Sequence, residues 1–314
     1  MSDYIMHDAV TKTIDVVGIG VSTLDMFTVV DAFPTIREVQ KAVAMVLDGG
    51  GPVATAMVTL AKLGANTVMI DNIGDDWSGS LILEDFKKHK VNTQYIEIFP
   101  AHSSSVANIL VQKDTGIRAI IYHPGSVPEV KDISKCAPII QGSKVLHLNG
   151  RHLEASLQAM DIAQKAGVKV SFDGGANRYN PNMRLVVPKV NICIVAKEFA
   201  LNYTGETTIA HAGRALLKVG PELVAITDGI NGSWIFNEDV GLFHQPAFKI
   251  DNVMDTTGCG DSYHGAFLYG LIHNMSLQKT AEFASAVAAL NTQFLGGRRG
   301  LPSLEIVEKF LLSY

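Results

Sequence analysis

From residue 145 to residue 227, short apolar segments alternate with longer amphipathic ones. The apolar segments have the length of buried strands. They are residues 145–148, 168–172, 191–195 and 223–227. Patterns typical of helices lie between most of them, and two longer helical patterns follow residue 257. A strand–helix–strand order favours a mostly parallel sheet with helices on both faces, so the expected fold class is α/β.

Two stretches do not follow this order. Residues 26–48 contain alternating apolar and polar positions, and residues 103–124 contain two strand-like segments separated by a turn at Lys113, Asp114, Thr115 and Gly116. Such a turn is typical of a β-hairpin. We therefore expect a single α/β domain over residues 14–312, with a small β-rich lid built from residues of about 26–48 and 103–124.

The overall charge and the cysteines exclude several classes of protein. The chain has 314 residues and a formal net charge of -5, so no basic face for nucleic acid is expected. Its three cysteines are far apart in the sequence, which excludes a disulfide framework and favours a reducing cytoplasm. Residues 1–13 are polar and indicate a frayed leader. The apolar stretch 42–61 contains Asp48, glycines and Pro52, so no membrane span is expected.

The run DTTGCGD at residues 255–261 leads directly into an apolar helical pattern. Backbone N–H groups at a helix N-terminus form an anion site, and Gly258 and Gly260 allow a close approach to them. Asp261 could cap the helix. It could equally take a proton from an attacking hydroxyl while the N–H groups of Gly258, Cys259 and Gly260 stabilise a transferred phosphoryl group. The run alone leaves both interpretations open.

Three other loops carry residues suited to binding. Gly49, Gly50 and Gly51 precede a helix pattern that begins at Pro52, and they form either a tight turn or a substrate-binding loop. Asp25 follows the first predicted strand and is either a solvated acid or a ligand for substrate hydroxyls. Arg151 and His152 follow the predicted strand at 145–148. Arg151 is suited to anions because its guanidinium is always charged, whereas His152 is more typical of a structural residue.

Two nucleotide-binding motifs are incomplete or absent. Gly18-Ile19-Gly20 has Thr23 where a dinucleotide fingerprint needs its third glycine, and a Walker A motif does not occur. Thr227, Gly229 and Gly232 follow a predicted strand, and they form either a hairpin turn or a flat surface for a nucleotide. An oxidoreductase with a nucleotide cofactor and a P-loop enzyme are therefore both disfavoured.

In this order, the motifs resemble the PfkB family of carbohydrate kinases, also called ribokinase-like, over about residues 14–312. DTTGCGD resembles the family signature DTTGAGD, with Cys259 in place of alanine. The N-terminal signature is also similar, with its glycine pair at Gly50 and Gly51 and its later motifs AKLG at 61–64 and IGDD at 73–76. The resemblance implies a ribokinase-like fold and transfer of a phosphoryl group from ATP, accompanied by Mg²⁺, to a sugar hydroxyl.

The resemblance also implies a role for each matching residue. Asp261 would be the catalytic base, and the N–H groups of Gly258, Cys259 and Gly260 would form the anion hole. The implied substrate residues are Asp25, Gly50 and Gly51. The implied ATP residues are Thr227, Gly229, Gly232 and Asn291. Asp255 matches a position that helps to bind a monovalent cation, which suggests K⁺.

Three positions depart from the family pattern. Thr55 replaces an asparagine of the N-terminal signature, which disfavours ribose or adenosine as the substrate. The family's NxxE motif for magnesium falls near residues 196–199, where Glu198 is the only acidic residue. The DxNxR pattern is altered between Asp173 and Arg178.

Within the family, residues 49–56, 149–152 and 244–258 are most similar to sulfofructose kinases. Arg151 lies where those enzymes keep a sulfonate-binding arginine, whereas Val39 and Tyr122 replace two other sulfonate contacts. The predicted substrate is a ketohexose-like or anionic sugar such as sulfofructose, with Thr55 and Tyr122 near it. A nucleoside kinase and a non-catalytic sugar or nucleotide sensor on the same fold are the alternatives. An exposed face of the lid sheet predicts a homodimer with contact between lids and a lid that moves when substrate binds.

Overall fold

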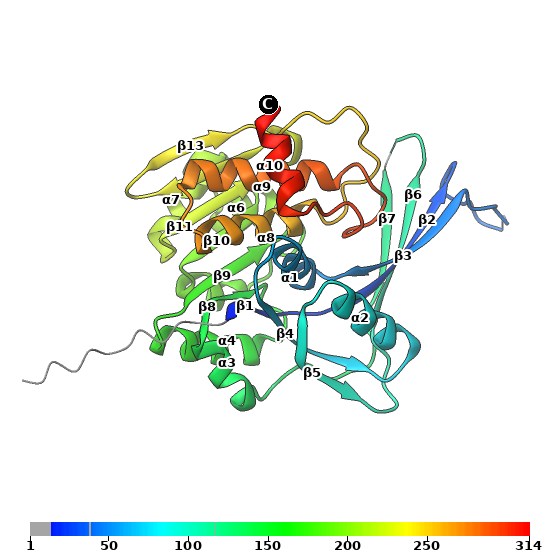
Figure 1. The fold of residues 1–314 in the computed structure, drawn as a ribbon, viewed down its shortest axis with the longest axis horizontal. Coiled ribbons are helices and arrows are strands. Elements are labelled where there is room, and N and C mark those ends of the chain that lie inside the picture. Colours follow the sequence, from blue (N-terminus) through cyan, green and yellow to red (C-terminus); the bar gives the residue numbers. More distant parts are fainter. Residues whose placement is uncertain (1–13, 38, 116) are drawn as a thin grey trace, which may run out of the picture.

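The computed structural model describes residues 14–37, 39–115 and 117–314. The predicted leader at 1–13 and Gly116 of the predicted turn lie outside these residues. Over the described residues, the model contains a nine-stranded main sheet and a four-stranded second sheet that stands beside it (Figure 1). The predicted α/β fold class, with its mostly parallel sheet, is confirmed.

The main sheet is parallel except at one edge, where two antiparallel strands are added. Its strands, in spatial order, are β13 (Gly241–Gln245), β12 (Ser233–Asn237), β11 (Leu223–Thr227), β10 (Ile192–Ala196), β9 (Lys169–Gly174), β8 (Ser143–Leu148), β1 (Ile14–Ile19), β4 (Thr67–Gly74) and β5 (Asn92–Phe99). Because the strands from β11 to β5 are all parallel, their carboxyl ends lie along one edge of the sheet.

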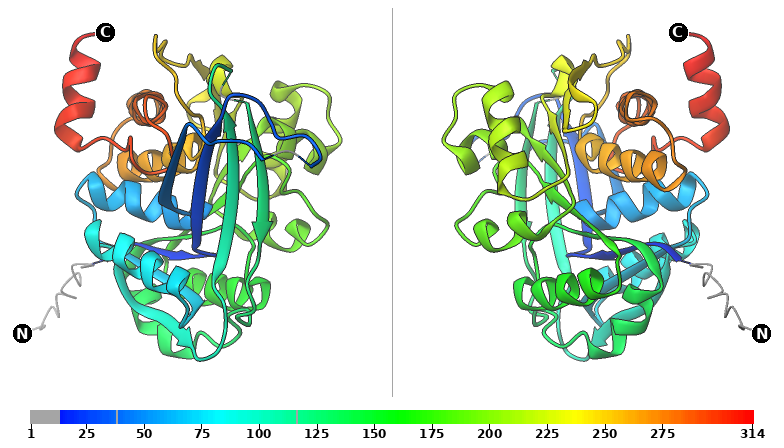
Figure 2. Two further views of the ribbon diagram at one scale, coloured as in Figure 1. Left: turned by 90° about the vertical axis from the view of Figure 1, so that its right-hand side faces the viewer. Right: turned by 90° about the vertical axis from the view of Figure 1, so that its left-hand side faces the viewer.

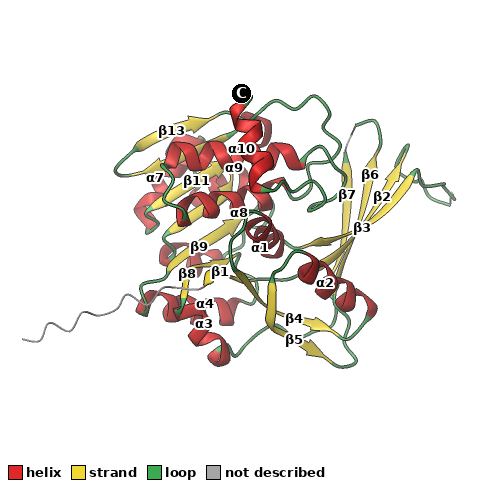
Figure 3. Cartoon of the chain, viewed as in Figure 1, coloured by secondary structure: helices red, strands yellow, loops and turns green. Residues whose placement is uncertain are grey.

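Helices cover both faces of the main sheet (Figure 3). One face packs against α1 (Pro52–Lys62), α2 (Trp77–Lys88), α8 (Cys259–Ile272), α9 (Leu277–Asn291) and α10 (Leu304–Leu312). The other face packs against α3 (Ala137–Gln141), α4 (Leu153–Lys165), α5 (Met183–Val186), α6 (Lys197–Thr204) and α7 (Ile209–Val219). Successive strand residues point to opposite faces, so Val16 belongs to the first core and Val17 to the second.

The second sheet, which we call the lid sheet, has the strand order β3 (Ala44–Gly50), β2 (Thr23–Val30), β6 (Ser105–Gln112) and β7 (Arg118–His123). Strands β2 and β6 are parallel, and the outer strands pair antiparallel to them. Figure 2 (left) shows this sheet standing in front of the helices and the main sheet. Phe27, Ile109 and Val111 form its small core.

Several boundaries differ from the prediction. The lid sheet begins at Thr23 and extends to Gly50, so Gly49 and Gly50 lie in a strand rather than in a loop. Residues 39–43, which were predicted to belong to the β-rich lid, precede β3 and are not part of a strand. Strands β5, β12 and β13 were not predicted. Strands β5 and β13 lie at the two edges of the sheet, and their alternating or polar sequences lack the continuous apolar character of the central strands. Strand β12 is a five-residue segment paired between β11 and β13.

Cys136, Cys193 and Cys259 are free thiols, as their spacing predicted. Among the described residues, no helix combines the length and the apolar character needed to cross a membrane.

Candidate active site

The N-terminus of α8 packs against the loop between α9 and α10, at Gly297. Gly258 is the N-cap and has a φ of 74°, and a Cβ at this position would lie 2.6 Å from the carbonyl oxygen of Gly297. The Thr257 N–H and Oγ1 donate to Asp255 Oδ1 over 2.9 and 2.8 Å, and the Gly296 N–H donates to Asp255 Oδ2 over 3.0 Å. The chain reversal before α8 therefore requires a glycine and uses Asp255 as an internal acceptor.

Asp261 lies in the first turn of α8 and is half-buried. Burial raises the pKa of its carboxyl group and the nearby Asp173 adds to this rise, whereas the charges of Arg178 and Arg298 oppose the shift. A carboxylate held this way is a better proton acceptor than one in water. Burial also raises the pKa of Cys259 to about 12, so this thiol stays neutral beside the helix N-terminus.

Asp25 faces the same region from the lid sheet. It lies in β2, which corrects its predicted place in a loop after the first strand. The register of the lid sheet aligns Asp48, Asp25, Ala107 and Tyr122 across its four strands, so these side chains point to one face. Burial raises the pKa of Asp25 to about 6, with smaller raising contributions from Asp48 and Asp261. A Cβ on Gly297 would lie 3.8 Å from Gly258 Cα and 4.0 Å from the Gly49 carbonyl oxygen, so the N-terminus of α8 lies near the end of the lid strand β3, where Gly50 packs against Asp25.

Two glycines allow the lid strand to pass close to this space. A Cβ on Gly50 would lie 2.2 Å from both carboxylate oxygens of Asp25. Gly51 has a φ of 89°, and a Cβ there would lie 2.1 Å from the Val21 carbonyl oxygen. Asp25 also accepts a hydrogen bond from Thr23 Oγ1 over 2.7 Å. The backbone around Gly50 is therefore open to a ligand only because side chains are absent.

Arg298, which the sequence analysis did not identify, holds the backbone of Gly50 in place through its side chain. It is 1% exposed, and its Nη2 donates to the Gly50 carbonyl oxygen over 2.6 Å. Its Nε donates to Thr55 Oγ1 over 3.1 Å, and its backbone N–H donates to Asp48 Oδ2 over 2.9 Å. Its Nη1 pairs with Asp85. The Thr55 hydroxyl is thus engaged by Arg298 beneath the strand and is itself buried.

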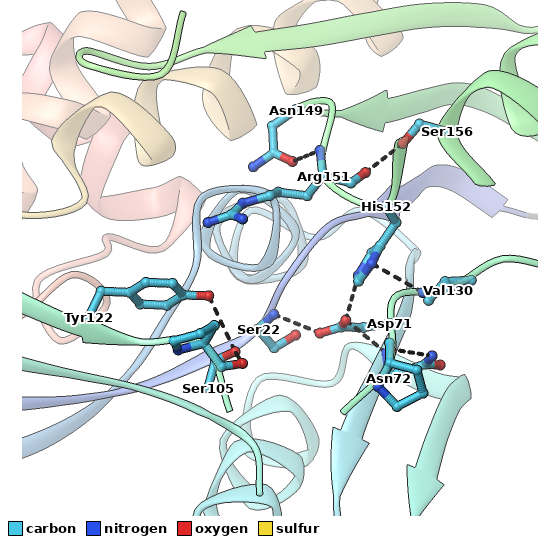
Figure 4. Close-up of polar contacts among 12 residues, drawn as sticks. Ser22, Asp71, Asn72, Ser105, Tyr122, Val130, Asn149, Arg151, His152 and Ser156 are labelled. Carbon is cyan, nitrogen blue, oxygen red and sulfur yellow. Dashed lines mark hydrogen bonds and ion pairs between the residues drawn. The ribbon is translucent and has the colours of Figure 1, made fainter. Parts of the chain in front are cut away.

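Arg151, which follows β8, and Tyr122, in β7 of the lid sheet, lie near each other (Figure 4). The Arg151 Cζ lies 5.7 Å from the centroid of the Tyr122 ring, and the Arg151 side chain is exposed. The Tyr122 hydroxyl donates to Ser105 Oγ over 3.4 Å. A permanent positive charge and a hydroxyl group therefore border the open side of this space.

His152 holds the backbone next to Arg151 (Figure 4). The Val130 N–H donates to its Nδ1 over 3.2 Å, so its Nε2 carries the hydrogen and donates to Asp71 Oδ1 over 2.9 Å. Asp71 also accepts from the N–H groups of Ser22 and Asn72. This buried network gives His152 the structural place that its residue type suggested.

The residues predicted to bind ATP lie further along the same edge of the sheet. Thr227 ends β11, and the Asp228 N–H donates to the Gly232 carbonyl oxygen over 2.9 Å, which closes the turn into β12. Gly229 and Gly232 have φ values of 54° and 87°. Lys197 Nζ lies 2.9 Å from Asp228 Oδ2. The segment is therefore a β-hairpin turn.

Glu198 and Asn291 occupy different environments. Glu198 is exposed in the first turn of α6, at the carboxyl end of β10. Asn291 ends α9 and is fully buried, and its Nδ2 donates to the Gly297 carbonyl oxygen over 2.9 Å. Asn291 thus supports the loop that packs against Gly258.

The structure brings the N-terminus of α8, Gly50 and Asp25 close together through the segment at Gly297, and it places Arg151 against Tyr122, which lies on the same face of the lid sheet as Asp25. Thr227, Gly229, Gly232 and Glu198 lie at the ends of β10 and β11, and Thr55 and Asn291 lie in the supporting layer. Arg298 and its carboxylate partners were missed because contacts such as Arg298 to Asp48 join distant parts of the chain. The one signal for Arg298 is the glycine-flanked run GGRRG at residues 296–300.

Comparison with known proteins gives a consistent result. The chain is 25% identical over 310 residues to the deoxyribokinase of Salmonella typhi, covering 95% of this chain and 98% of the relative. Its fold matches the structure of Arabidopsis thaliana ribokinase complexed with ribose and ATP, with a TM-score of 0.83 and 24% identity over 95% and 99% of the two chains. It also matches Sinorhizobium meliloti adenosine kinase, with a TM-score of 0.83 and 21% identity over 95% and 99%.

The family model of the pfkB carbohydrate kinases matches residues 13–304, which is nearly the whole chain. The relatives include kinases that act on sugars and kinases that act on nucleosides. The chain therefore belongs to the pfkB family of carbohydrate kinases and is a phosphotransferase enzyme.

Proposed function

We propose that the enzyme transfers the γ-phosphoryl group of ATP to a hydroxyl group of a ketohexose-like or anionic sugar. The observation that supports this most strongly is that the glycine-flanked helix N-terminus that carries Asp261 packs, through Gly297, near the end of β3, where Gly50 lies against Asp25 of the lid sheet. One carboxylate is placed for proton transfer at an anion site, and the other is placed to accept hydrogen bonds from sugar hydroxyls.

In the proposed step, the sugar hydroxyl oxygen attacks the γ-phosphorus while its proton moves to Asp261. The bond between the γ-phosphorus and the bridging oxygen breaks, and ADP leaves with that electron pair. The N–H groups of Gly258, Cys259 and Gly260 stabilise the charge on the transferred group. The positive end of α8 adds to this stabilisation. The raised pKa of Asp261 suits it to hold the proton while the group transfers.

For the substrate, we assign Asp25 and the N–H groups of Gly50 and Gly51 to hydroxyl recognition. Arg151 and Tyr122 would meet the far end of the sugar, where an anionic group such as the sulfonate of sulfofructose would pair with the guanidinium. Thr55 contributes through Arg298, which fixes the Gly50 carbonyl group.

The experiment is a panel of ketohexoses, sugar acids, sulfofructose, ribose and adenosine, assayed by ADP release. An anionic ketohexose should have the highest kcat/KM. Arg151→Ala should raise the KM for that substrate at least about 10-fold while changing neutral sugars little, because only a charge pair is lost. Arg214→Ala, at an exposed position on α7, is the matched control. An unchanged KM in Arg151→Ala would refute the anionic substrate. Turnover of adenosine alone would indicate a nucleoside kinase, and a melting shift without ADP would indicate a sensor.

ATP would bind along the edge formed by Thr227, Gly229 and Gly232, with Asn291 shaping the adenine pocket from beneath. Glu198 fits a role in holding Mg²⁺ through water, because its exposed carboxylate lies at the same edge. The Mg²⁺ ion would neutralise charge on the phosphates of ATP.

Asp255 could share its oxygens with K⁺, since each carboxylate oxygen offers more than one lone pair and only three internal hydrogen bonds use them. We therefore propose that K⁺ raises kcat relative to Na⁺ at equal ionic strength. Equal rates in the two salts would contradict this assignment.

We also propose a homodimer formed through the outer face of the lid sheet. Met45, Leu47 and Ile121 point away from the site and are 69%, 45% and 64% exposed. Burying them against a second lid would remove apolar surface from water. Light scattering should give the mass of two chains for the wild-type protein and the mass of one chain for the Met45→Glu variant. A monomeric wild-type protein would refute the dimer.

Free thiols and the use of ATP favour the cytoplasm as the location of the enzyme.

A further inference from the structure

A buried cluster of three titratable side chains lies next to the first turn of α8 and has no role in the steps above. His147 comes from β8, Asp173 from β9 and His264 from α8. His147 pairs in register with Ser171, two residues before Asp173, so His147 and Asp173 point to the same face of the sheet. This is the face that α8 covers.

These side chains are 0%, 1% and 4% exposed, and most of their polar atoms lack a hydrogen-bond partner among the described residues. The atoms without a partner are His147 Nε2, both carboxylate oxygens of Asp173 and His264 Nδ1. Buried polar groups are almost always satisfied, because removing them from water without a partner costs free energy. His264 can give one nitrogen to a shared species, and its Nε2 is the nitrogen near Asp173. The unsatisfied atoms of His147 and Asp173 beside it indicate that another species completes the cluster.

The spacing of the cluster matches a metal site. One ligand atom from each of the three residues lies within 4.8 Å of the others, and His264 Nε2 is 3.4 Å from Asp173 Oδ1. Tetrahedral zinc with bonds of about 2.1 Å separates its ligand atoms by about 3.4 Å. The distance between His264 Nε2 and Asp173 Oδ1 therefore already equals that of two zinc ligands. The other two pairs of ligand atoms would have to approach each other by about 1 Å.

The surroundings of the ligands favour metal binding. Ser171 Oγ lies 3.1 Å from His147 Nδ1, so Nδ1 already has a partner and Nε2 is the ring nitrogen left for another species. Burial lowers the pKa of His147 to about 3 and that of His264 to about 4, so both imidazoles are neutral near pH 7. The Arg178 Nη1 lies 3.7 Å from Asp173 Oδ2, on the side of the carboxylate away from the His264 contact.

We propose that His147, Asp173 and His264 bind one divalent transition-metal ion of the Zn²⁺ class. Two imidazoles and one carboxylate suit Zn²⁺, Co²⁺ or Ni²⁺, whereas Mg²⁺ prefers oxygen ligands. The site is separate from the Mg²⁺ that accompanies ATP. A bound ion would join β8, β9 and α8, and would therefore stabilise the helix that carries Asp261. Ordered water is the competing occupant, and it would leave the metal unbound.

The test uses the full chain, stripped of metal with EDTA and titrated with Co²⁺ in excess Mg²⁺ without ATP. We expect one tightly bound Co²⁺ per chain, the visible absorption of tetrahedral Co²⁺, and a rise in Tm of at least about 3 °C. Less than one tightly bound equivalent, or an octahedral spectrum, would overturn the proposal. Kinase activity is not the readout, so this result and the proposed function are tested independently.

Variants locate the ion. His147→Gln and Asp173→Asn should weaken Co²⁺ binding by more than about 100-fold. This loss is larger than the one expected from removing a residue that only hydrogen-bonds to a metal ligand, which is about 10- to 100-fold. His244→Gln, which changes an exposed histidine on β13, should leave binding unchanged. Circular dichroism checks folding. If both ligand variants misfold, Ser171→Ala keeps all three ligands and should weaken binding about 10- to 100-fold. Wild-type affinity in any folded variant of the cluster would overturn the assignment.

Discussion

Asp25 should make the folded enzyme less stable at neutral pH than it would be with an uncharged residue in its place. Burial raises the pKa of Asp25 from 3.8 to about 6. A shift of this size corresponds to about 3 kcal/mol, because the folded state must hold a charge that the unfolded chain leaves in water. The Asp25→Asn variant removes that charge and keeps the oxygen that accepts from Thr23 Oγ1.

The sign of the effect follows from the direction of the shift. Between pH 3.8 and pH 6 the folded state binds the Asp25 proton more readily than the unfolded state, so stability from this group is lost as pH rises through that window. We expect Asp25→Asn to raise the free energy of unfolding by about 1–3 kcal/mol at pH 7.5, since the new amide N–H₂ offsets part of the gain. The gain should shrink toward pH 4.

The assay is urea unfolding of the wild type and the variant at pH 7.5 and pH 4.5, with the KM for sugar measured alongside. Asp31→Asn, at an exposed position, is the control and should change stability by less than about 0.5 kcal/mol. A variant that is no more stable than the wild type at pH 7.5 would refute the reasoning, as would a gain that does not depend on pH. We also expect Asp25→Asn to raise the KM for the sugar, because residues that bind polar ligands often lower the stability of the folded protein.

Three further predictions concern the same site. Arg298→Ala should lower the free energy of unfolding by about 3–5 kcal/mol in urea, because it removes the buried guanidinium that pairs with Asp85 and donates to the Gly50 carbonyl oxygen and Thr55 Oγ1. The exposed Arg299→Ala should be neutral, and equal effects of the two substitutions would contradict the role of Arg298. Gly258→Ala should lower kcat at least about 10-fold, because the new Cβ would displace the N-terminus of α8. Gly260→Ala should keep the wild-type Tm, because a Cβ at this position would have no atom within 4 Å. In steady-state assays, kcat/KM should fall on the acid side with an inflection near pH 6, as Asp25 is protonated, and a profile flat through pH 6 would count against its role.

The central elements of the fold were predictable from local sequence. The helix after Gly51 begins at Pro52 in the structure, as a proline at the first helical position predicts. The lid hairpin of β6 and β7 was also found, because its strands alternate around a polar turn. Strands β5 and β13 were missed because edge strands carry fewer apolar residues. Strand β12 was missed because its pairing depends on β11 and β13 beside it.

The site was predictable only in part. DTTGCGD and the glycines before α1 are local patterns, and they led to Asp261 and Gly50. The sequence did not indicate that Asp25 would lie in the lid, because its strand pairs with segments far along the chain. Arg298 and the cluster of His147, Asp173 and His264 depend wholly on tertiary packing. Such buried polar and charged side chains have no local spacing that a sequence pattern could detect.

The most direct test of the proposed mechanism is the turnover of Asp261→Asn with ATP, Mg²⁺ and the best sugar of the panel. The carboxamide has nearly the same shape but cannot accept the proton, so we expect the wild-type Tm and a loss of kcat of about 100- to 10,000-fold. The KM for the sugar should change much less than kcat. A folded Asp261→Asn enzyme with near-normal turnover would contradict the assignment of Asp261 as the base.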